Sequence, residues 1–414
     1  MHGVRRIRWL LTAVLVLMGL AAAPAAARAH GSTTGDHHRP TAERVCHQSS
    51  DPLVASCTAM ARTDLPPMAH VPPNARPPGF SPQDLRRAYR LNGQRGRGRT
   101  VAITVAFHHP NIASDLAVYR RQFGLPPCTT GSGCFRVINQ RGGSTLPTTV
   151  DPSWSFEEAI DVDMVSAACS DCRILVIEAD DDHLSNLLTA VDQAVAQGAK
   201  FVTNSWFVPE NPLEAGLDFH FSNNPGVAFN FASGDSGGVP VWPSTSPYVT
   251  SVGGTSLIPL HTPRGFGETA WGGTGCGCST FEPKPAFQQG PHFCPNSRTT
   301  VDVSAVADPS TGVAVYTTVP PFDNVTGWLV AGGTSVSSPL VAGMYALAGN
   351  PAPGTFPNSY PYAHPQDFFD ITVGTAGSFS AGPGYDAPTG IGTPDGVAGL
   401  RDPWDGWHGG GWWT

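Results

Sequence analysis

The sequence has few charged side chains and no excess of positive charge. Charged residues make up 14% of the 414 residues, and the formal net charge is −8. Such a chain lacks the basic surface that attracts phosphate backbones or anionic lipids, so we expect no nucleic-acid partner. Glycine and proline are abundant and hydrophobic runs recur, which fits a loop-rich globular chain better than a helical bundle or a disordered chain.

Long hydrophobic runs are absent except at the N-terminus. Three arginines in the first eight residues precede an apolar run that ends in the small-x-small sequence Ala27-Arg28-Ala29. This pattern predicts a signal peptide over residues 1–29, with an uncleaved membrane anchor as the alternative. Cleavage would remove four arginines and no acid, which takes the formal charge from −8 to −12. We therefore expect a secreted, extracellular chain without stable membrane association.

The nine cysteines fit an exported protein, because disulfides persist in oxidising compartments. A zinc site that uses Cys169 and Cys172 is the alternative, but no histidine spacing supports it. One thiol is left without a partner. The spacing predicts three local disulfides and a fourth of open connectivity: Cys46–Cys57, Cys128–Cys134, Cys169–Cys172, and Cys294 with either Cys276 or Cys278.

No internal repeat and no second domain of distinct composition is visible. Residues 30–77 are rich in Pro, His and Ala and are interpreted as an N-terminal extension that lies over the domain or is trimmed. We expect the main domain over residues 78–400, with a first helix at Pro82 capped by Ser81. Residues 401–414 form a tail rich in Gly and Trp, either a surface-binding patch or a disordered end.

Apolar, β-branched runs alternate with helical segments from residue 100 onward. The segment Leu184–Gln197 has apolar residues at three- and four-residue steps, as in an amphipathic helix. Buried strands that alternate with helices predict an α/β fold with a mostly parallel, twisted sheet and helices on both faces. Ligands of such folds bind beyond the carboxyl ends of the strands. The expected strands are Thr100–Phe107, Arg173–Glu178, Lys200–Trp206, Val227–Ala232, Tyr248–Val252, Val301–Ala307 and Gly312–Thr318.

A candidate nucleophile lies in the stretch Gly332-Gly333-Thr334-Ser335-Val336-Ser337-Ser338-Pro339. The paired glycines permit a sharp turn, and Ser335 is expected where a helix begins, with Pro339 tolerated in the first turn. The positive end of a helix can stabilise negative charge that develops beside a nucleophile. A plain N-cap serine is the alternative.

A candidate acid/base pair lies in the predicted helix around residues 154–168. Glu157 and Asp161 are four residues apart, so their side chains lie on one helical face. In a partly dry site two such carboxylates would share a proton, which raises the pKa of at least one of them. An exposed acidic face is the alternative, although no Lys or Arg follows Arg141 before Arg173.

A third candidate, Asp235, lies between glycines where the strand that begins near Gly226 ends. A protonated Asp235 pointing into a cleft would donate a hydrogen bond to an oxyanion. The sequence Gly234-Asp235-Ser236-Gly237-Gly238 also matches the nucleophile motif of trypsin-like proteases, with Ser236 as nucleophile. That reading conflicts with the absence of an Ala-Ala-His-Cys motif and with the expected α/β fold. A plain turn is the remaining alternative.

These stretches together resemble the motifs of the sedolisins, the serine-carboxyl peptidases. The motifs are Glu157-x-x-Ile160-Asp161, Ser233-Gly234-Asp235-Ser236-Gly237 and Gly333-Thr334-Ser335-x-x-x-Pro339, and the likeness covers residues 78–398. The resemblance implies a subtilisin-like fold. It further implies Ser335 as the nucleophile, Glu157 as general base and acid, Asp161 as its supporting carboxylate, and Asp235 as the oxyanion donor.

The resemblance also implies one bound calcium ion. Asp370 and Asp386, with glycine-rich turns around them, could supply hard oxygen ligands of the kind calcium accepts. A glycine-rich surface loop is the alternative. The implied ligands are the side chains of Asp370 and Asp386 and the main-chain oxygens of Ile371, Gly382 and Gly384.

We therefore expect a secreted serine-type endopeptidase that hydrolyses proteins or peptides as a monomer. A carboxylate base must be ionised and a carboxyl donor must be protonated, so we expect an acid optimum. A conventional subtilisin is disfavoured, because its His-Gly-Thr-His motif is absent and His108-His109 does not replace it. A catalytically inactive secreted binding protein on the same fold is the main alternative. The sedolisins usually carry a large prodomain, for which residues 30–77 are too short.

Overall fold

The computed structural model describes residues 40–73, 75–289, 293–322 and 325–403. The predicted signal peptide and most of the Gly- and Trp-rich tail lie outside these residues. In the described part of the chain, no helix combines the length and hydrophobicity needed to cross a membrane.

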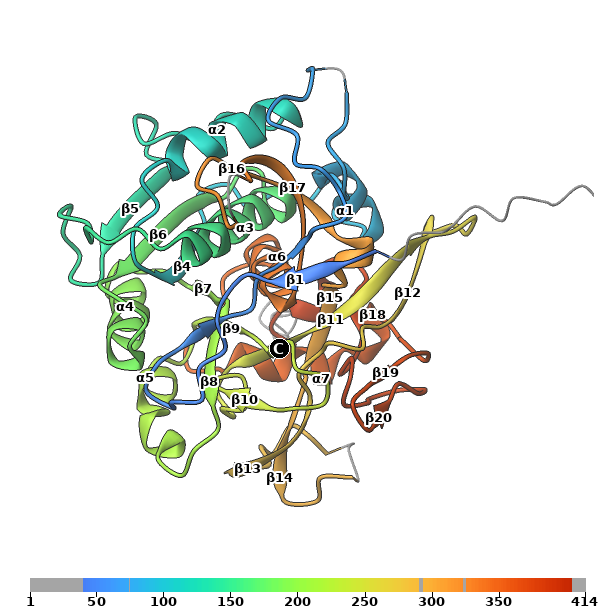
Figure 1. Cartoon of the computed structure of the whole chain (residues 1–414). Coiled ribbons are helices and arrows are strands. Elements are labelled where there is room, and N and C mark those ends of the chain that lie inside the picture. The colour runs from blue at the N-terminus through green and yellow to red at the C-terminus, as the bar shows by residue number, and fades with distance from the viewer. Residues whose placement is uncertain (1–39, 74, 290–292, 323–324, 404–414) are drawn as a thin grey trace, which may run out of the picture. The chain divides into compact units, whose positions relative to one another are not determined.

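The main element is a mixed sheet of eight strands among the described residues (Figure 1). All strand pairs in it are parallel except that of β11 with β12. Its order is β12 (Phe266–Ala270), β11 (Thr250–Pro259), β9 (Ala228–Ala232), β7 (Phe201–Asn204), β4 (Thr100–Ala106), β6 (Arg173–Ala179) and β5 (Phe135–Asn139), with β15 (Val303–Val306) also paired to β11.

Most predicted elements of the sheet are confirmed, within one to a few residues at each end. The predicted strand Lys200–Trp206 is an exception. It ends at Asn204, and a separate strand, β8 (Trp206–Pro209), follows. The predicted strand at Tyr248–Val252 extends further, to Pro259. The helices are α1 (Pro82–Ala88), α2 (Ile112–Gln122), α3 (Pro152–Ala168), α4 (Leu184–Ala196), α5 (Phe219–Ser222), α6 (Thr334–Ala348) and α7 (Tyr360–Ala363).

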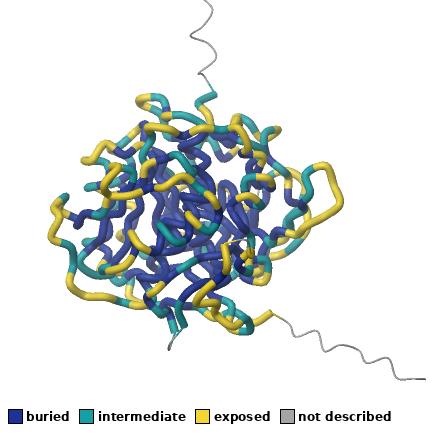
Figure 2. Tube along the Cα trace, turned by 90° about the horizontal axis from the view of Figure 1, so that it is seen from above, coloured by how far each residue is buried: buried dark blue, intermediate teal, exposed yellow. Residues whose placement is uncertain are grey.

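Both faces of the sheet are covered, as the uninterrupted hydrophobic strands predict. Every residue of β7 and β9 is buried, and α6 packs against both strands. Helix α3 packs on α6 and β4, and α4 packs on β4 and β6. Figure 2 shows the buried residues in the interior and the exposed ones along the outer loops. The predicted α/β architecture, a mostly parallel sheet with helices on both faces, is therefore confirmed.

Helix α6 differs from its prediction in two details. Its N-cap is Gly333, so Ser335 is the second helical residue rather than the residue at which the helix begins. Pro339 lies inside the helix and not in its first turn. The helix begins earlier than predicted because Gly333 alone separates it from β17 (Gly327–Gly332). The φ of 93° at Gly333 lets the backbone pass directly from the strand into the helix. Ser335 nevertheless stays within the positive end of the helix.

Residues 40–77 contain strands that the sequence did not predict, and they belong to the same compact unit as the main domain. β1 (Ala42–Arg44) pairs with β3 (Met60–Arg62), which pairs with β17, and β17 pairs with β16 (Val313–Thr317). β2 (Ser56–Cys57) pairs with β8, which also pairs with β10 (Val241–Trp242). Three further two-stranded pairs are β13 (Gly277–Pro283) with β14 (Ser297–Thr300), β18 (Phe368–Phe369) with β21 (Thr393–Pro394), and β19 (Thr375–Ala376) with β20 (Phe379–Ser380).

The disulfides agree with the prediction and resolve its open choice. The three local bridges form as expected, and Cys294 is bonded to Cys278. Cys276 is the free, buried cysteine. The Cys169–Cys172 bridge removes the zinc alternative for these two residues.

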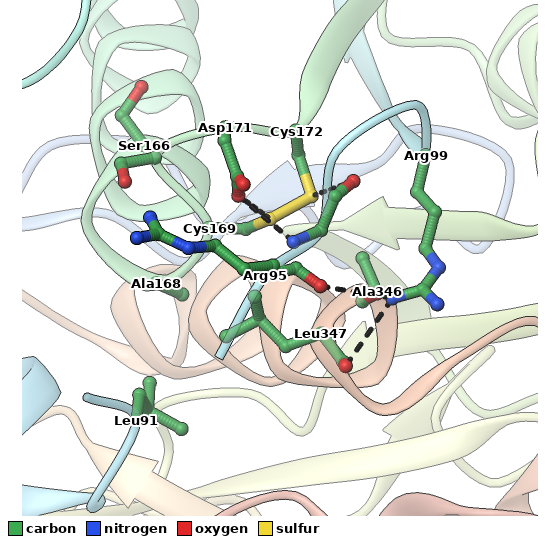
Figure 3. Close-up of a disulfide and its surroundings, with 12 residues drawn as sticks. Leu91, Arg95, Arg99, Ser166, Ala168, Cys169, Asp171, Cys172, Ala346 and Leu347 are labelled. Atoms are coloured by element: carbon green, nitrogen blue, oxygen red, sulfur yellow. Dashed lines mark hydrogen bonds between the residues drawn. A yellow bond between two sulfur atoms is a disulfide. The ribbon is translucent and has the colours of Figure 1, made fainter. Parts of the chain in front are cut away.

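The Cys169–Cys172 disulfide lies where the ends of α3 and α6 meet (Figure 3). Cys169 caps α3, and a Cβ on Gly343 of α6 would lie 2.7 Å from Cβ of Ala168, so glycine permits the close helix contact. Arg99 donates to the carbonyl oxygens of Ala346 (2.7 Å) and Leu347 (3.4 Å) at the end of α6. This junction fixes the helix that carries Glu157 against the helix that carries Ser335.

We expect Gly96→Ala to destabilise this junction. A Cβ on Gly96 would lie 2.2 Å and 2.4 Å from the two bridged sulfur atoms. Overpacking of a buried site costs about 1–3 kcal/mol, so the melting temperature should fall by several degrees. Gly131→Ala is the matched control, because its Cβ would meet nothing within 4 Å and the residue has no positive φ. Equal melting temperatures for the two variants would contradict the close contact.

Candidate active site

Helix α3 brings two carboxylates into the protein interior. The helix begins after Asp151, whose side chain accepts hydrogen bonds from the N–H groups of Ser153 (2.9 Å) and Trp154 (3.0 Å). Pro152 occupies the first turn, where its missing N–H has no cost. Every residue from 154 to 168 is buried, so the exposed acidic face that was the alternative is excluded.

Ser335 directly contacts one of these carboxylates. Its Oγ donates to Oε2 of Glu157 at 2.7 Å, and the serine is fully buried. The hydroxyl of Thr58 lies 2.7 Å from the same Oγ. Only glycine fits at position 333, two residues before Ser335, because a Cβ there would lie 1.9 Å from the carbonyl oxygen of Thr58. The site therefore brings the candidate nucleophile into contact with its candidate base.

Asp161 lies behind Glu157, one turn along α3. Its Oδ1 accepts a hydrogen bond from Oγ of Ser205 at 2.6 Å, while Oδ2 of Asp161 and Oε1 of Glu157 are buried without a partner among the described residues. Burial raises the pKa of both carboxyls well above the usual range, and the charge of Asp161 raises the pKa of Glu157 further. The hydrogen bond from Ser335 opposes this by favouring ionised Glu157. The pair therefore tends to hold a shared proton.

Asp235 approaches the same serine from the carboxyl end of β9. Its Oδ1 accepts hydrogen bonds from the N–H (2.9 Å) and the hydroxyl (2.8 Å) of Thr334, whereas Oδ2 has no partner among the described residues. Oδ2 lies 2.7 Å from the position a Cβ on Gly333 would take. Burial raises the pKa of Asp235 to about 6, although the bonds from Thr334 oppose the shift. When protonated, Oδ2 is a free donor near the candidate nucleophile.

The structure thus brings the four sequence-predicted residues Glu157, Asp161, Asp235 and Ser335 together at the carboxyl edge of β7 and β9. Ser236, the nucleophile of the alternative reading, is exposed. Trp206, considered as a wall of the cleft or as a core aromatic, is fully buried and donates to Oγ1 of Thr104 at 3.0 Å, so it is a core residue.

Three contacts of the site were not predicted from the sequence. They come from Ser205, which bonds Asp161, from Thr58, and from Arg44, whose guanidinium donates to the main-chain oxygen of Asp235. Ser205 follows β7 and had a detectable signal, because polar residues after buried strands gather at a site. Thr58 and Arg44 lie in residues 30–77, where no periodic pattern marked them.

A second group of carboxyls lies beside β8 and was not predicted as a group. Glu210 raises the pKa of Glu214, and Asp218 raises the pKa of Glu282, because the carboxyls of each pair are neighbours. Burial raises the pKa of Asp218 to about 6, of Glu282 to about 8 and of Glu214 to about 9. Each pair is favourable only while it holds a proton, because two adjacent carboxylates repel.

The predicted calcium ligands lie close together in the loops after β18. Asp370 accepts from the N–H of Gly384 (3.0 Å), and Asp386 accepts from the N–H of Gly382 (2.9 Å) and of Thr389 (2.8 Å). Burial raises the pKa of Asp386 to about 6, and the charge of Asp370 contributes to the shift. Two neighbouring carboxylates are oxygen ligands of the kind that a hard cation accepts, although in this structure both accept hydrogen bonds from N–H groups. No group of three or more His, Cys, Asp or Glu suited to a metal occurs among the described residues.

The fold and the serine–carboxylate site define a subtilisin-like serine peptidase scaffold. Comparison with known proteins agrees. The sequence profile described as "Subtilase family" matches residues 155–392, which is more than half of the chain. The chain belongs to this family, and its matched relatives identify it as a member of the sedolisin group.

The chain is similar to two characterised relatives and to one solved structure. Kumamolisin of Bacillus sp. (strain MN-32) is 29% identical over 370 residues, covering 79% of this chain and 64% of kumamolisin. Sedolisin of Pseudomonas sp. (strain 101) is 29% identical over 267 residues, covering 54% of this chain and 44% of sedolisin. The chain thus matches less than two thirds of either relative's length.

The solved structure supports the fold alone. It is Pseudomonas sedolisin, a serine-carboxyl proteinase, complexed with two molecules of pseudo-iodotyrostatin, and it aligns with a TM-score of 0.67 at 24% identity. The alignment covers 78% of this chain and 96% of that chain.

We expect stability to fall as the pH rises from acid to neutral and beyond. A carboxyl whose pKa is higher in the folded chain than in the unfolded chain stabilises the folded state fully when the pH is below its unfolded-state pKa, near 4. This stabilisation is lost as the pH rises through the folded-state pKa. For Asp218, Glu282 and Glu214 the folded values are about 6, 8 and 9. The urea midpoint should therefore decrease between pH 4 and pH 9.

Glu214→Gln tests the origin of this dependence, because the amide mimics the protonated carboxyl and cannot ionise. This variant should lose less stability between pH 4 and pH 9 than the native chain does. Glu43→Gln, at an exposed residue, should leave the dependence unchanged. A native midpoint that rises over the same interval would show that the assigned carboxyls do not control stability.

Proposed function

We propose that this chain is a serine-carboxyl endopeptidase that hydrolyses peptide bonds through an acyl-enzyme on Ser335. The observation that carries the proposal is the buried 2.7 Å hydrogen bond from Oγ of Ser335 to Oε2 of Glu157. A serine hydroxyl is a weak nucleophile until an adjacent base removes its proton. Membership of the subtilase family supports the same reaction class.

In this reaction the ionised carboxylate of Glu157 takes the proton of Ser335 as Oγ attacks the carbonyl carbon. Protonated Asp235 donates from Oδ2 to the oxyanion, and the positive end of α6 adds stabilisation. Glu157 then returns the proton to the leaving amine. Water releases the acyl group by the reverse sequence of proton transfers, which regenerates the serine hydroxyl. Asp161 acts through Glu157, because it supports the charge and position of that carboxyl.

The chemistry requires acid conditions. Asp235 is a donor only while protonated, and its pKa of about 6 sets an upper limit on activity. The lower limit comes from the Glu157–Asp161 pair, which must lose at least one proton before Glu157 can act as a base. The optimum therefore lies below neutrality. Coupled carboxyls determine it, rather than a single group.

The substrates follow from the same chemistry. Proteins or peptides are cleaved, and the acidic chain has no nucleic-acid partner. The disulfides fit an extracellular protein, and we assign secretion to the predicted signal at residues 1–29. We propose a monomer without stable membrane association.

The second candidate function is an inactive binding protein on the same fold. The observation in its favour is that Ser335 and Glu157 are at most 1% exposed and that the serine contacts Thr58, so the site is covered. A binding protein would keep its function when Ser335 is replaced by alanine.

One calcium ion would be held by the side chains of Asp370 and Asp386 and by the main-chain oxygens of Ile371, Gly382 and Gly384. The ion would supply positive charge between two carboxylates and fix the loops after β18. The loop that carries Asp386 contacts the segment before β15, since Val301 donates its N–H to the carbonyl oxygen of Ala387 at 3.0 Å and Ile391 donates its N–H to that of Asp302 at 2.8 Å. Calcium would thereby stabilise the segment that leads into β15.

We expect Ser335→Ala to abolish cleavage of a denatured protein at every pH from 2 to 8, and Glu157→Gln to do nearly the same. Loss of a nucleophile or its base typically lowers kcat by about 10⁴–10⁶-fold. Glu158→Gln is the matched control, because Glu158 is a buried neighbour without contact to Ser335. Activity at neutral pH that survives Glu157→Gln would contradict the assignment of the base.

Asp235 gives a second, sharper prediction. Asp235→Ala removes the donor and should lower kcat by about 10²–10³-fold. In Asp235→Asn the amide oxygen can still accept from Thr334 while its NH₂ group donates at every pH. The upper limb of the pH–activity profile should therefore move to higher pH in this variant. An unchanged limb would mean that another group controls it.

Calcium should raise the melting temperature of the native chain, and a chelator should reverse the increase. A ligand at a hundred times its Kd stabilises the native state by about 2.7 kcal/mol. The double variant Asp370→Asn, Asp386→Asn should show no calcium-dependent shift, and magnesium should act weakly on the native chain. A shift of the same size in the double variant would place the ion elsewhere.

A further inference from the structure

The candidate oxyanion donor, Asp235, is bonded to the residue that precedes the candidate nucleophile. Thr334 is the first residue of α6, and its N–H is one of the first-turn amides that have no partner within a helix. The N-cap residue, Gly333, has no side chain that could accept from it. Oδ1 of Asp235 accepts this N–H at 2.9 Å instead. A carboxyl from the loop after β9 therefore caps the helix that carries Ser335.

The hydroxyl of Thr334 makes a second bond to the same carboxyl oxygen. Its Oγ1 donates to Oδ1 of Asp235 at 2.8 Å and accepts from the N–H of Gly234 at 3.2 Å. Because an N–H can only donate, the bond from Gly234 leaves the hydroxyl hydrogen free to point at Asp235. Thr334 is fully buried, so bulk water does not compete for either bond. The backbone of Gly234 therefore fixes the direction in which the hydroxyl donates.

These bonds determine which oxygen of Asp235 carries the proton. Oδ1 accepts from two donors of Thr334, which together occupy both of its lone pairs. Oδ2 is buried and has no partner among the described residues. A proton on Oδ1 would displace one of the two bonds, whereas a proton on Oδ2 displaces neither. The acid form of Asp235 is therefore an acceptor through Oδ1 and a donor through Oδ2.

Resting on the function proposed above, we propose that Thr334 is a positioning residue of the reaction, whose hydroxyl keeps the proton of Asp235 on Oδ2, the oxygen that faces the developing oxyanion. Thr334 acts through Asp235 and does not itself touch the substrate. Since one peptide bond joins Thr334 to Ser335, the same contact sets the place of the donor relative to the nucleophile. A donor that is held in advance needs no reorganisation when negative charge forms on the substrate.

Charged groups from two other elements also act on Asp235. Burial raises its pKa to about 6, against the bonds from Thr334 and the charge of Arg44 in β1. Glu157 of α3, whose raised pKa comes mainly from burial and from Asp161, also responds to the charge of Asp235. The hydroxyl of Thr334 thus has two opposing effects on catalysis. It aims the donor, but it also favours the ionised carboxylate, which cannot donate.

Thr334→Val should separate these two effects. The variant keeps the N–H bond to Oδ1 but leaves one lone pair of that oxygen free, so the proton can occupy either oxygen. With a fluorogenic peptide that the native chain cleaves, kcat should fall about 10-fold while KM stays nearly unchanged. The upper limb of the pH–kcat profile should move to higher pH, because a bond that favoured the ionised carboxylate is lost. Slower turnover over a wider pH range is not the result of a merely loosened site.

Thr334→Ser is the matched control, since it keeps the hydroxyl and loses only a methyl group. Its kcat should stay within about 2-fold of the native value, and its upper limb should not move. Thr334→Val also leaves the N–H of Gly234 without its partner, which lowers stability. Both variants are therefore assayed at a temperature at which each is fully folded. Equal kcat values and equal upper limbs for the two variants would overturn the proposal.

A double-mutant cycle tests whether Thr334 acts through Asp235. In the Asp235→Ala background no carboxyl remains to be positioned, so adding Thr334→Val should change kcat by less than about 2-fold. A fall of about 10-fold in that background as well would mean that the hydroxyl contacts the substrate itself. That result would overturn the positioning role.

NMR of the carboxyl carbons gives a readout that does not depend on turnover. In Ser335→Ala chain labelled at the aspartate carboxyls, the resonance that is lost on Asp235→Asn identifies Asp235. The pKa of Asp235 should be higher when Thr334→Val is added and unchanged when Thr334→Ser is added. The same pKa in both variants would contradict the contact between the hydroxyl and the carboxyl.

Hydrolysis of a denatured unrelated protein separates failure of this proposal from failure of the proposed function. Hydrolysis that depends on Ser335, with a kcat and an upper limb that Thr334→Val leaves unchanged, overturns the role of Thr334 and leaves the peptidase assignment standing. The absence of hydrolysis by the native chain at every acid and neutral pH overturns both.

Discussion

The removal of carboxyl groups from water is the constraint on which the site depends. Glu157 and Asp161 are buried on α3, a helix that carries no basic residue, and Asp235 is buried opposite them. In such surroundings an ionised carboxylate is costly unless hydrogen bonds favour it, so the protonated form is stabilised. One constraint thus supplies both chemical needs: a base that is ionised mainly when Ser335 donates to it, and an acid that keeps a proton for an oxyanion.

The architecture makes this arrangement stable. A parallel sheet covered on both faces provides a dry interior at which α3 and α6 can meet, and the close contact of Gly343 with Ala168 lets their backbones approach. The junction at the Cys169–Cys172 disulfide and Arg99 fixes the far ends of the two helices (Figure 3). The packing of the far ends of α3 and α6 therefore helps to position Glu157 against Ser335. Loops at the strand ends bring Asp235 and Ser205 to a position that the helices already define.

The sequence predicted the fold, and the elements that carry the candidate site residues, where physical patterns are local. Buried strands, the spacing of Glu157 and Asp161, and the glycines before Ser335 depend on neighbours in the chain. The strands within residues 40–77 could not be predicted, because they are two or three residues long and exist only through pairing with distant strands or with one another: β2 with β8, β3 with β17, and β1 with β3. The split of the strand after Asn204 and the position of Pro339 inside α6 likewise depend on tertiary contacts. The roles of the site residues and the calcium ligands stay predictions.

The N-terminal strands also act on the electrostatics of the site. The guanidinium of Arg44, in β1, donates to the main-chain oxygen of Asp235 and lowers the pKa of its carboxyl, which opposes the upward shift caused by burial. Removal of this positive charge would let the carboxyl of Asp235 hold its proton to higher pH, which favours donation to an oxyanion. The burial of the carboxyl and the charge that β1 brings beside it therefore act on the protonation of Asp235 in opposite directions.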